Sequence, residues 1–204
     1  MASVQYAEVM TEPAGLRERK KWRTRKVLIE TAYRLFERQG YDRTTTAEIA
    51  AAAEVSTATF FNHFATKEDL LLTGDGEEIL RVGLDVLAAR EEGETPARLL
   101  RRAMLGMLAE AGAGLRDPRA EPERIRLDLI TSVPSVRATM LQRAFDAQER
   151  LSAALCRACE IDEVDAAALV GAATGAVFAA GRTALRLGTP LDEAMRRAIV
   201  LATA

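Results

Sequence analysis

Residues 40–70 read GYDRTTTAEIAAAAEVSTATFFNHFATKEDL, and they contain three helix starts in quick succession. Thr45 and Glu48 have the spacing of a capping box, which predicts a short helix that ends near residue 53. Ser56 is placed to cap a second short helix, and Thr66 is placed to cap a third. Two short helices joined by one tight turn, with a further helix in front, predict a tri-helical helix-turn-helix.

The second of these helices begins with short side chains. Ser56, Thr57, Ala58 and Thr59 are small enough to enter a DNA major groove, where a recognition helix reads base edges with its first turn. The alanines at 50–53 leave room for the two helices to cross closely. An ordinary helical hairpin with capped ends fits the same pattern, and the pattern by itself does not choose between the two.

A longer helix is predicted in front of this motif. Apolar residues recur in pairs at helical spacing from about Leu16 to Gln39, and Gly40 suits the left-handed residue that ends a helix. Its first part carries seven basic residues against Glu18 alone: Arg17, Arg19, Lys20, Lys21, Arg23, Arg25 and Lys26. Such a run is either the footprint of an anionic partner or a solvated helix face.

The rest of the chain repeats helical periodicity without strand alternation or internal repeats, so the predicted fold is all-α with about nine helices. Further helices are expected to start at Lys67, with a kink near Gly74 and Gly76, and at Thr95-Pro96. A short helix is expected to end at Val133-Pro134, and a long one to run from Val136 to Leu155. The last two helices are expected over Val164–Leu187, before Gly188, and over Leu191–Ala202, after Thr189-Pro190. A loop is expected over Gly112–Pro122.

At 204 residues the chain is long enough for two small domains. The predicted organisation is a flexible tail at 1–16, a helix-turn-helix DNA-binding domain at 17–66, and a ligand-binding and dimerisation domain at 67–204. This division assigns the whole region after the motif to a single helical domain.

Several classes of protein are disfavoured by composition. No apolar stretch approaches the roughly 18 residues that span a bilayer, and residues 1–15 lack a signal-peptide pattern, so a cytoplasmic protein without a membrane is expected. Cys156 and Cys159 have no second ligand pair, so no metal or cofactor is expected, and they are interpreted as helix-face residues. The sequence shows no catalytic triad or phosphate-binding loop, which disfavours an enzyme. A helical interaction or carrier protein stays as an alternative.

The segments Gly40–Ala50, Val55–Phe64 and Thr66–Leu70 together resemble the N-terminal domain of the TetR family of repressors, over roughly residues 17–72. The caps, the aromatic residues, the histidine and the lysine all fall at the spacing of that family. The resemblance implies a homodimer that binds a palindromic double-stranded DNA operator. It also implies release from DNA when a small molecule enters the C-terminal domain.

Carried over position by position, the resemblance implies a DNA-binding set of nine residues. These are Thr45, Ser56, Thr57, Ala58, Thr59, Phe61, Asn62, His63 and Lys67. His63 and Lys67 are expected at phosphates, Lys67 with help from the positive N-terminus of its own helix, although His63 could simply pack. Tyr41, Phe60 and Phe64 are expected in the core. Trp22 could approach DNA or pack on the domain, and the sequence does not decide.

Three positions depart from the family pattern. Glu54 stands where a glycine is usual, and a left-handed backbone there costs a glutamate on the order of 1 kcal/mol. Ala58 replaces another frequent glycine and adds a methyl group that could touch a thymine methyl. Phe61 stands where tyrosine is frequent, so a possible phosphate hydrogen bond is lost.

The last eighty or so residues resemble, more weakly, the corresponding domain of mycofactocin-system regulators within the same family. The resemblance rests on Arg124–Leu127, Val133–Arg137 and Thr189–Ala194, and it implies an acyl-CoA-like effector. Apolar residues suited to a pocket wall are Met104, Met107, Met140, Phe145 and Phe178, although residues of this kind are far more often plain core. The small residues Gly171, Ala172, Gly175, Ala179 and Gly181 predict that the helix over 164–187 packs closely, with the last helix, against a second copy of the chain.

Overall fold

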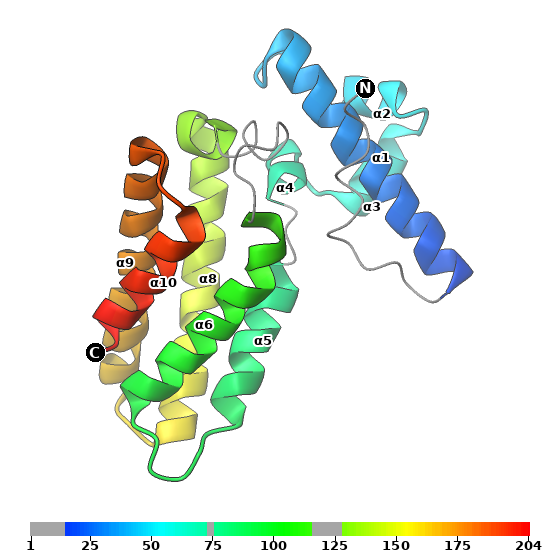
Figure 1. The fold of residues 1–204 in the computed structure, drawn as a ribbon. Helices are drawn as coiled ribbons and strands as arrows, with labels where there is room; N and C mark the ends of the chain where they lie inside the picture. Colours follow the sequence, from blue (N-terminus) through cyan, green and yellow to red (C-terminus); the bar gives the residue numbers. More distant parts are fainter. Residues whose placement is uncertain (1–14, 73–75, 116–127) are drawn as a thin grey trace. The chain divides into compact units, whose positions relative to one another are not determined.

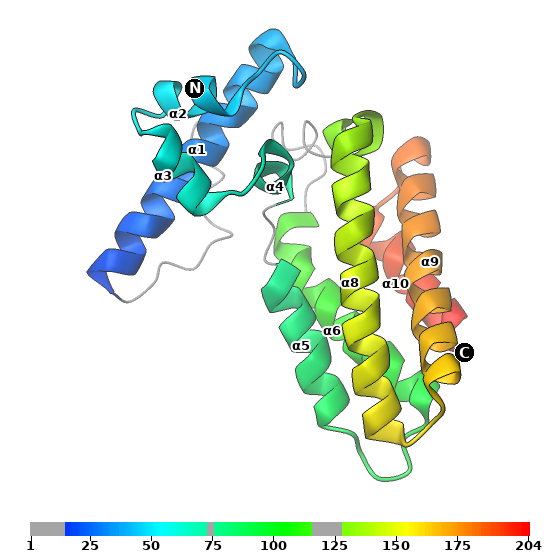
Figure 2. The same ribbon diagram turned by 180° about the vertical axis from the view of Figure 1, so that it is seen from behind.

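The computed structural model describes residues 15–72, 76–115 and 128–204, and every regular element within these ranges is a helix, as Figures 1 and 2 show. The all-α prediction is therefore confirmed. The helices are α1 (Leu16–Gln39), α2 (Thr46–Ala52), α3 (Thr57–His63), α4 (Lys67–Leu71), α5 (Gly76–Ala88), α6 (Pro96–Leu115), α8 (Pro134–Cys159), α9 (Glu163–Leu187) and α10 (Leu191–Ala202). Residues 128–132 are helical as well.

Local signals set most of the helix ends. Gly40 follows α1 with a φ of +83°, and Gly188 follows α9 with a φ of +67°, a region that L side chains rarely adopt. Thr45, Ser56 and Thr66 cap α2, α3 and α4 through their side chains, as the sequence predicted. The boundaries predicted for α1 and α10 agree with the structure to the residue.

Two predicted elements differ from the structure. The loop expected from Gly112 is wrong at its start, because α6 continues as helix to Leu115. A glycine costs a helix only about 1 kcal/mol relative to alanine, which the rest of a twenty-residue helix outweighs. The long helix expected from Lys67 consists, where described, of the separate helices α4 and α5. The expectations for 1–14, Gly74, 116–122, Ile125 and Arg124–Leu127 fall outside the described residues.

The chain forms two compact units, and each is built from two separate segments of the sequence. The first unit comprises residues 1–73 and 119–140, and the second comprises 74–118 and 141–204. The first core contains Leu28, Ala32, Phe36, Tyr41, Ile49, Phe60, Phe64, Leu70 and Val136, with Leu129, Ile130 and Val133 packed against it. The boundary predicted between 66 and 67 stays a prediction.

The second unit is built around α5, α6, α9 and α10. In it α5 packs on α6, and α10 packs on both α6 and α9 (Figure 1). A Cβ atom at Gly83 of α5 would lie only 2.5 Å from Met107 Sδ of α6, so the glycine permits this close crossing. The fully buried residues Leu87, Leu99, Leu100, Leu155 and Val170 form much of its core.

Helix α9 corrects the expectation that no apolar stretch approaches the length that spans a bilayer. It carries no charged residue from Ala166 to Gly181, and by length and composition alone it is apolar enough to cross a membrane. Only 22% of its most apolar window is buried within the chain. The core helices of water-soluble proteins can meet the same criterion, so the distinctive feature of α9 is an apolar surface that this chain leaves largely uncovered.

Candidate nucleic-acid interface

Helix α3 has one buried face and one exposed face. Phe60 and Phe64 are 0% and 3% exposed in the core of the first unit. Thr57, Ala58, Phe61 and Asn62 are exposed along the opposite face. The spacing of these four residues places them on one helical stripe. Because the two phenylalanines anchor α3 in the core, the exposed stripe is held in a fixed position.

The hydroxyl groups at the start of α3 are engaged with each other. Ser56 Oγ accepts a hydrogen bond from the Thr59 backbone N–H at 3.0 Å and lies 2.8 Å from Thr59 Oγ1. Ser56 is therefore the N-cap of the helix, and Thr59 is half-buried behind it. Thr57 and Asn62 carry the exposed polar groups of the stripe.

Thr45 caps α2 in a complete capping box. Its backbone N–H donates to Glu48 Oε2 at 2.8 Å, and its Oγ1 accepts from the Glu48 backbone N–H at 3.2 Å. Its hydroxyl also donates to the same carboxylate oxygen at 2.8 Å. These bonds lower the pKa of Glu48, so the carboxylate stays ionised beside Thr45.

The turn between α2 and α3 is closed by backbone hydrogen bonds. The Glu54 N–H donates to the Ala51 carbonyl at 3.1 Å, and the Val55 N–H donates to the Ala50 carbonyl at 3.0 Å. Glu54 has a φ of +56°, which confirms the left-handed backbone that the sequence pattern indicated there. Its side chain is exposed.

His63, the last residue of α3, is half-buried. Its backbone carbonyl accepts a hydrogen bond from Arg25 Nη1 at 3.1 Å, and the Arg25 guanidinium lies 4.5 Å from the centre of the Phe64 ring. Its Nδ1 is buried without a hydrogen-bond partner among the described residues. Burial, and then the charges of Arg25 and Lys21, lower the pKa of His63. The ring is therefore neutral at pH 7 in the free protein.

Lys67 reaches back across the domain to the loop after α1. Its Nζ donates to the Tyr41 carbonyl at 2.7 Å and to the Thr44 carbonyl at 2.9 Å, and it lies 3.9 Å from the centre of the Tyr41 ring. An ammonium group has three donors, so two of them hold this loop in place. Burial lowers the pKa of Lys67. The phosphate contact expected of Lys67 stays a prediction, and the loop contacts are a second role that the sequence did not reveal.

Trp22 lies on α1 where the helix joins the domain. It is half-buried, its Nε1 has no hydrogen-bond partner among the described residues, and Lys26 Nζ lies 5.4 Å from its ring centre. Packing on the domain thus accounts for part of its surface.

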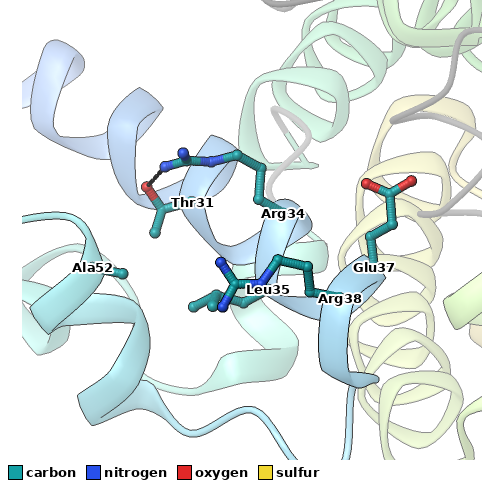
Figure 3. Close-up of a pocket in the computed structure, with 6 residues that line it drawn as sticks. All are labelled: Thr31, Arg34, Leu35, Glu37, Arg38 and Ala52. Carbon is teal, nitrogen blue, oxygen red and sulfur yellow. Dashed lines mark hydrogen bonds between the residues drawn. The ribbon is translucent and has the colours of Figure 1, made fainter.

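A shallow hollow of about 240 Å³ also lies on the first unit, between α1 and α2. Figure 3 shows its six lining residues: Thr31, Arg34, Leu35, Glu37, Arg38 and Ala52. The single hydrogen bond drawn among them runs from Arg34 Nη2 to Thr31 Oγ1 at 3.0 Å. No residue of the expected DNA-binding set lines this hollow.

The residues expected to form a ligand pocket are dispersed. Met104 is buried in the core of the second unit, and Met107 packs against it. Phe178 is half-buried on α9, and Met140 belongs to the first unit. Phe145 is 61% exposed and lines a groove of about 450 Å³ between α8 and α9. The groove also contains Cys156 and Arg157 but none of the other four.

The cysteines of this region are half-buried thiols. Cys156 Sγ donates to the Ile161 carbonyl at 3.1 Å, and burial raises the pKa of the Cys159 thiol. No group of three or more metal-ligating side chains occurs in the part of the chain that the structure describes.

Sequence reasoning missed Arg25 as a positioning residue. The basic run drew attention to charge, whereas the structure uses this guanidinium to tie α1 to the end of α3. Nothing in local sequence signals that bond, because 38 residues separate its two partners.

Known proteins are similar to this chain in sequence and in fold. Residues 28–73 match the family described as bacterial regulatory proteins, tetR family. Over 139 residues the chain is 37% identical to the HTH-type transcriptional regulator TcmR of Streptomyces glaucescens, which covers 68% of this chain and 61% of that protein. Over 77 residues it is 32% identical to the uncharacterized HTH-type transcriptional regulator YuxN of Bacillus subtilis (strain 168), which covers 38% and 26% of the two chains. The chain thus matches less than two thirds of either relative.

The structure of a SmeT–triclosan complex has the same fold, with a TM-score of 0.59 and 17% sequence identity. The likeness covers 88% of this chain and 90% of that chain. At this level of identity the likeness concerns the fold alone.

Proposed function

The chain belongs to the TetR family of bacterial regulatory proteins, and on this premise we propose that it is a transcriptional repressor that binds a palindromic DNA operator as a homodimer. We further propose that a small molecule held by the second unit releases it from DNA, and that it acts in the cytoplasm. Proteins of this family regulate transcription, so the proposal assigns no enzymatic reaction.

The exposed stripe of α3 is the observation that carries the proposal. Thr57 and Asn62 offer hydrogen-bonding groups, and Ala58 and Phe61 offer apolar surface, on a helix held in place from behind by Phe60. Base edges in the major groove present donors, acceptors and the thymine methyl group, which these side chains can match. Phosphate contacts by Thr45, His63 and Lys67 would fix the register of the helix on the duplex.

A second copy of the chain would cover the uncovered face of α9. Ala168, Ala172, Gly175 and Ala179 are exposed, or near-exposed, small residues at spacings of four, three and four along the helix. A Cβ atom at Gly175 would meet nothing within 4 Å, so this face points away from the rest of the chain. Such spacing gives a straight seam that lets a neighbouring helix approach closely. The exposed Leu201 of α10 extends the apolar surface.

The groove between α8 and α9 supports an amphipathic effector. Phe145 supplies an exposed aromatic surface, and Arg157 supplies a cationic group about three helical turns further along α8, in a lining that also contains Glu149 and Glu163. An acyl chain joined to an anionic head group, as in an acyl-CoA, combines the two matching chemistries. The volume of about 450 Å³ is within the range of small-molecule sites.

The first experiment is selection of bound fragments from random duplex DNA by the full-length protein. The expected result is one inverted repeat whose half-sites are about one helical turn apart. Thr57→Ala and Asn62→Ala should change the preferred bases, whereas Ala109→Ser, at an exposed position of α6, should not. Failure to enrich any duplex would refute the repressor and leave a helical interaction protein.

A further inference from the structure

The basic first part of α1 lies outside the domain core. Buried residues of α1 begin at Leu28, so residues 16–26 extend about 16 Å of helix that contributes nothing to that core. Figures 1 and 2 both show this dark-blue segment running past α2 and α3. We refer to residues 16–26 as the basic extension.

The charges of the basic extension are unbalanced where the structure describes them. Five of its cations are exposed, and none of the five forms an ion pair among the described residues: Arg17, Arg19, Lys20, Lys21 and Arg23. Lys26, at the inner end, pairs with Glu30 at 3.9 Å. An exposed helix face ordinarily mixes both signs of charge, whereas this one has Glu18 as its single acid.

Local rules of helix stability also oppose the basic extension. Gly15 precedes the helix without a side-chain cap, and Arg17 and Arg19 flank Glu18 in the first turn, where the helix dipole favours negative charges. Arg19 and Arg23 are four residues apart, so like charges lie over each other on the helix surface. A segment that breaks several stability rules at once is expected where a function compensates for it.

The basic extension is tied to the recognition helix. Arg25, at its inner end, donates to the His63 carbonyl at the end of α3 and stacks on Phe64. Trp22, on the same helix, is half-buried, with Lys26 Nζ over its ring. Wherever α3 is placed on DNA, this cationic helix is carried with it as part of the same unit.

We propose that the basic extension is a second DNA-binding element, whose exposed cations contact backbone phosphates of the duplex that α3 reads. Duplex DNA is the fitting anion because its backbone is densely charged and because the proposed DNA-reading helix α3 belongs to the same unit. Phosphate contacts carry no base information, so the extension adds affinity and not sequence preference. The inference rests on the proposed function, because it assumes that α3 binds DNA.

The test measures how binding depends on salt. The full-length wild type is compared with Arg19→Gln/Lys20→Gln/Arg23→Gln on the duplex obtained by selection and on a 40-bp duplex of unrelated sequence. Each lost phosphate contact lowers the slope of log K against log salt by about 0.9, so a drop of at least about 2 per dimer is expected on both duplexes. Preference for the selected duplex should stay the same.

A matched control removes the same charge from the second unit. Arg98→Gln/Arg143→Gln/Arg186→Gln takes away three exposed arginines and should leave the salt slope unchanged. The thermal midpoint of the basic-extension variant should equal or exceed that of the wild type, because repulsion between like charges is relieved. A lower midpoint would contradict the claim that this segment opposes local stability.

The outcomes separate the two proposals. If the wild type enriches no duplex, the proposed repressor fails, and this inference fails with it. If the wild type binds its duplex and the triple variant keeps the same salt slope, the basic extension does not contact phosphates, although the repressor stands. Loss of binding to phosphatidylserine vesicles, with an unchanged slope on DNA, would assign the extension to membranes and overturn the inference.

Discussion

Glu54 occupies the turn that sets the angle between α2 and α3, and its backbone φ is +56°. A residue with a Cβ atom pays about 1–2 kcal/mol for this left-handed conformation, and glycine avoids the clash. Two backbone hydrogen bonds in the turn, from Glu54 and Val55, maintain the geometry. The same residue places a negative charge beside the proposed DNA-reading helix.

Replacing Glu54 by glycine should therefore stabilise the protein and strengthen operator binding. Glu54→Gly is expected to raise the free energy of unfolding by about 0.5–1 kcal/mol. The gain is smaller than the strain that is relieved, because glycine loses more chain entropy on folding than glutamate does. Urea unfolding measures the stability, and a gel-shift titration measures the affinity.

Two variants separate strain from charge. Glu54→Gln keeps the strained backbone and removes the charge, so it should improve DNA affinity without the gain in stability. Glu160 has a φ of +54° directly after α8, in the second unit, and Glu160→Gly should stabilise without changing DNA affinity. If Glu54→Gly leaves the unfolding free energy at or below the wild-type value, the strain argument is wrong.

His63 gives stability a pH dependence of known sign. Its pKa lies below the usual value of about 6.5, because burial and nearby cations disfavour the imidazolium. In the window just below pH 6.5 the unfolded chain binds more protons than the folded one, so the free energy of unfolding falls as pH falls. His63→Gln should flatten this decline, as measured by urea unfolding between pH 7.5 and 5.5.

The sole histidine of the chain makes this assignment clean. A phosphate next to the ring would favour the imidazolium, so operator affinity should change in the opposite direction and increase as pH falls. His63→Gln should remove that increase too. Operator binding that is equally pH-dependent in wild type and variant would contradict a phosphate contact at His63.

At the scale of elements, α8 belongs to both compact units. Its residues 134–140 cluster with the first unit, and residues 141–159 cluster with the second. Val136 is fully buried in the first core, and the buried Tyr41 hydroxyl lies near Glu68 and Ser135. Burial, followed by the Glu68 carboxylate, raises the pKa of Tyr41.

Val136→Ala should therefore destabilise the first unit, although Val136 is far along the chain from the helix-turn-helix. The loss of two buried methyl groups and the resulting cavity should cost about 2 kcal/mol. Hydrogen exchange of α1–α3 amides measures the effect. Val164→Ala, at a residue that is 74% exposed, is the control and should change nothing. Unchanged protection in α1–α3 of the Val136→Ala variant would show that this packing contributes little.

At the scale of the whole molecule, we expect the apolar face of α9 to hold two copies of the chain together. Ala179 is exposed within the proposed seam, and Ala179→Arg would place an unpaired charge between two helices. The variant should sediment as a monomer at concentrations where the wild type is a dimer, and operator affinity should fall with it. Val177 is a poorer test site, because it packs partly against its own core.

The control for assembly is Ala109→Arg, at an exposed position of α6. It introduces the same charge on another helix and should leave the wild-type dimer intact. A dimeric Ala179→Arg protein with normal operator affinity would place the interface elsewhere.

In the proposed dimer, regulation by a ligand would be reciprocal. A ligand weakens operator binding only if it prefers a conformation that DNA disfavours, and DNA must then weaken ligand binding by the same factor. Titration of long-chain acyl-CoAs should change operator affinity about five- to 150-fold, the usual range of such coupling. Phe145→Ala/Arg157→Gln should abolish ligand binding and leave operator affinity intact. Acyl-CoAs that bind without changing operator affinity would indicate a constitutive DNA binder.

The sequence alone determined where most helices begin and end. Thr45 with Glu48, Ser56, Gly40 and Gly188 act through hydrogen bonds or backbone angles that involve only a few neighbouring residues, so their effect is readable in order along the chain. The caps also predicted two short helices joined by a tight turn, and the resemblance to the TetR family identified them as a helix-turn-helix with a left-handed turn at Glu54. The glycine at 112 misled, because a single glycine stops a helix only when the tertiary structure also ends it there.

Only the tertiary structure decided which distant segments meet. Lys67 bonds to carbonyls 26 and 23 residues away, Arg25 bonds to His63, and Val136 completes a core begun by α1. The tertiary structure also left Phe145 exposed, although its apolar side chain by itself suits a pocket wall or a core position. Contacts of this kind depend on how the chain returns on itself, and an apolar or charged residue carries no local mark of the partner it will find.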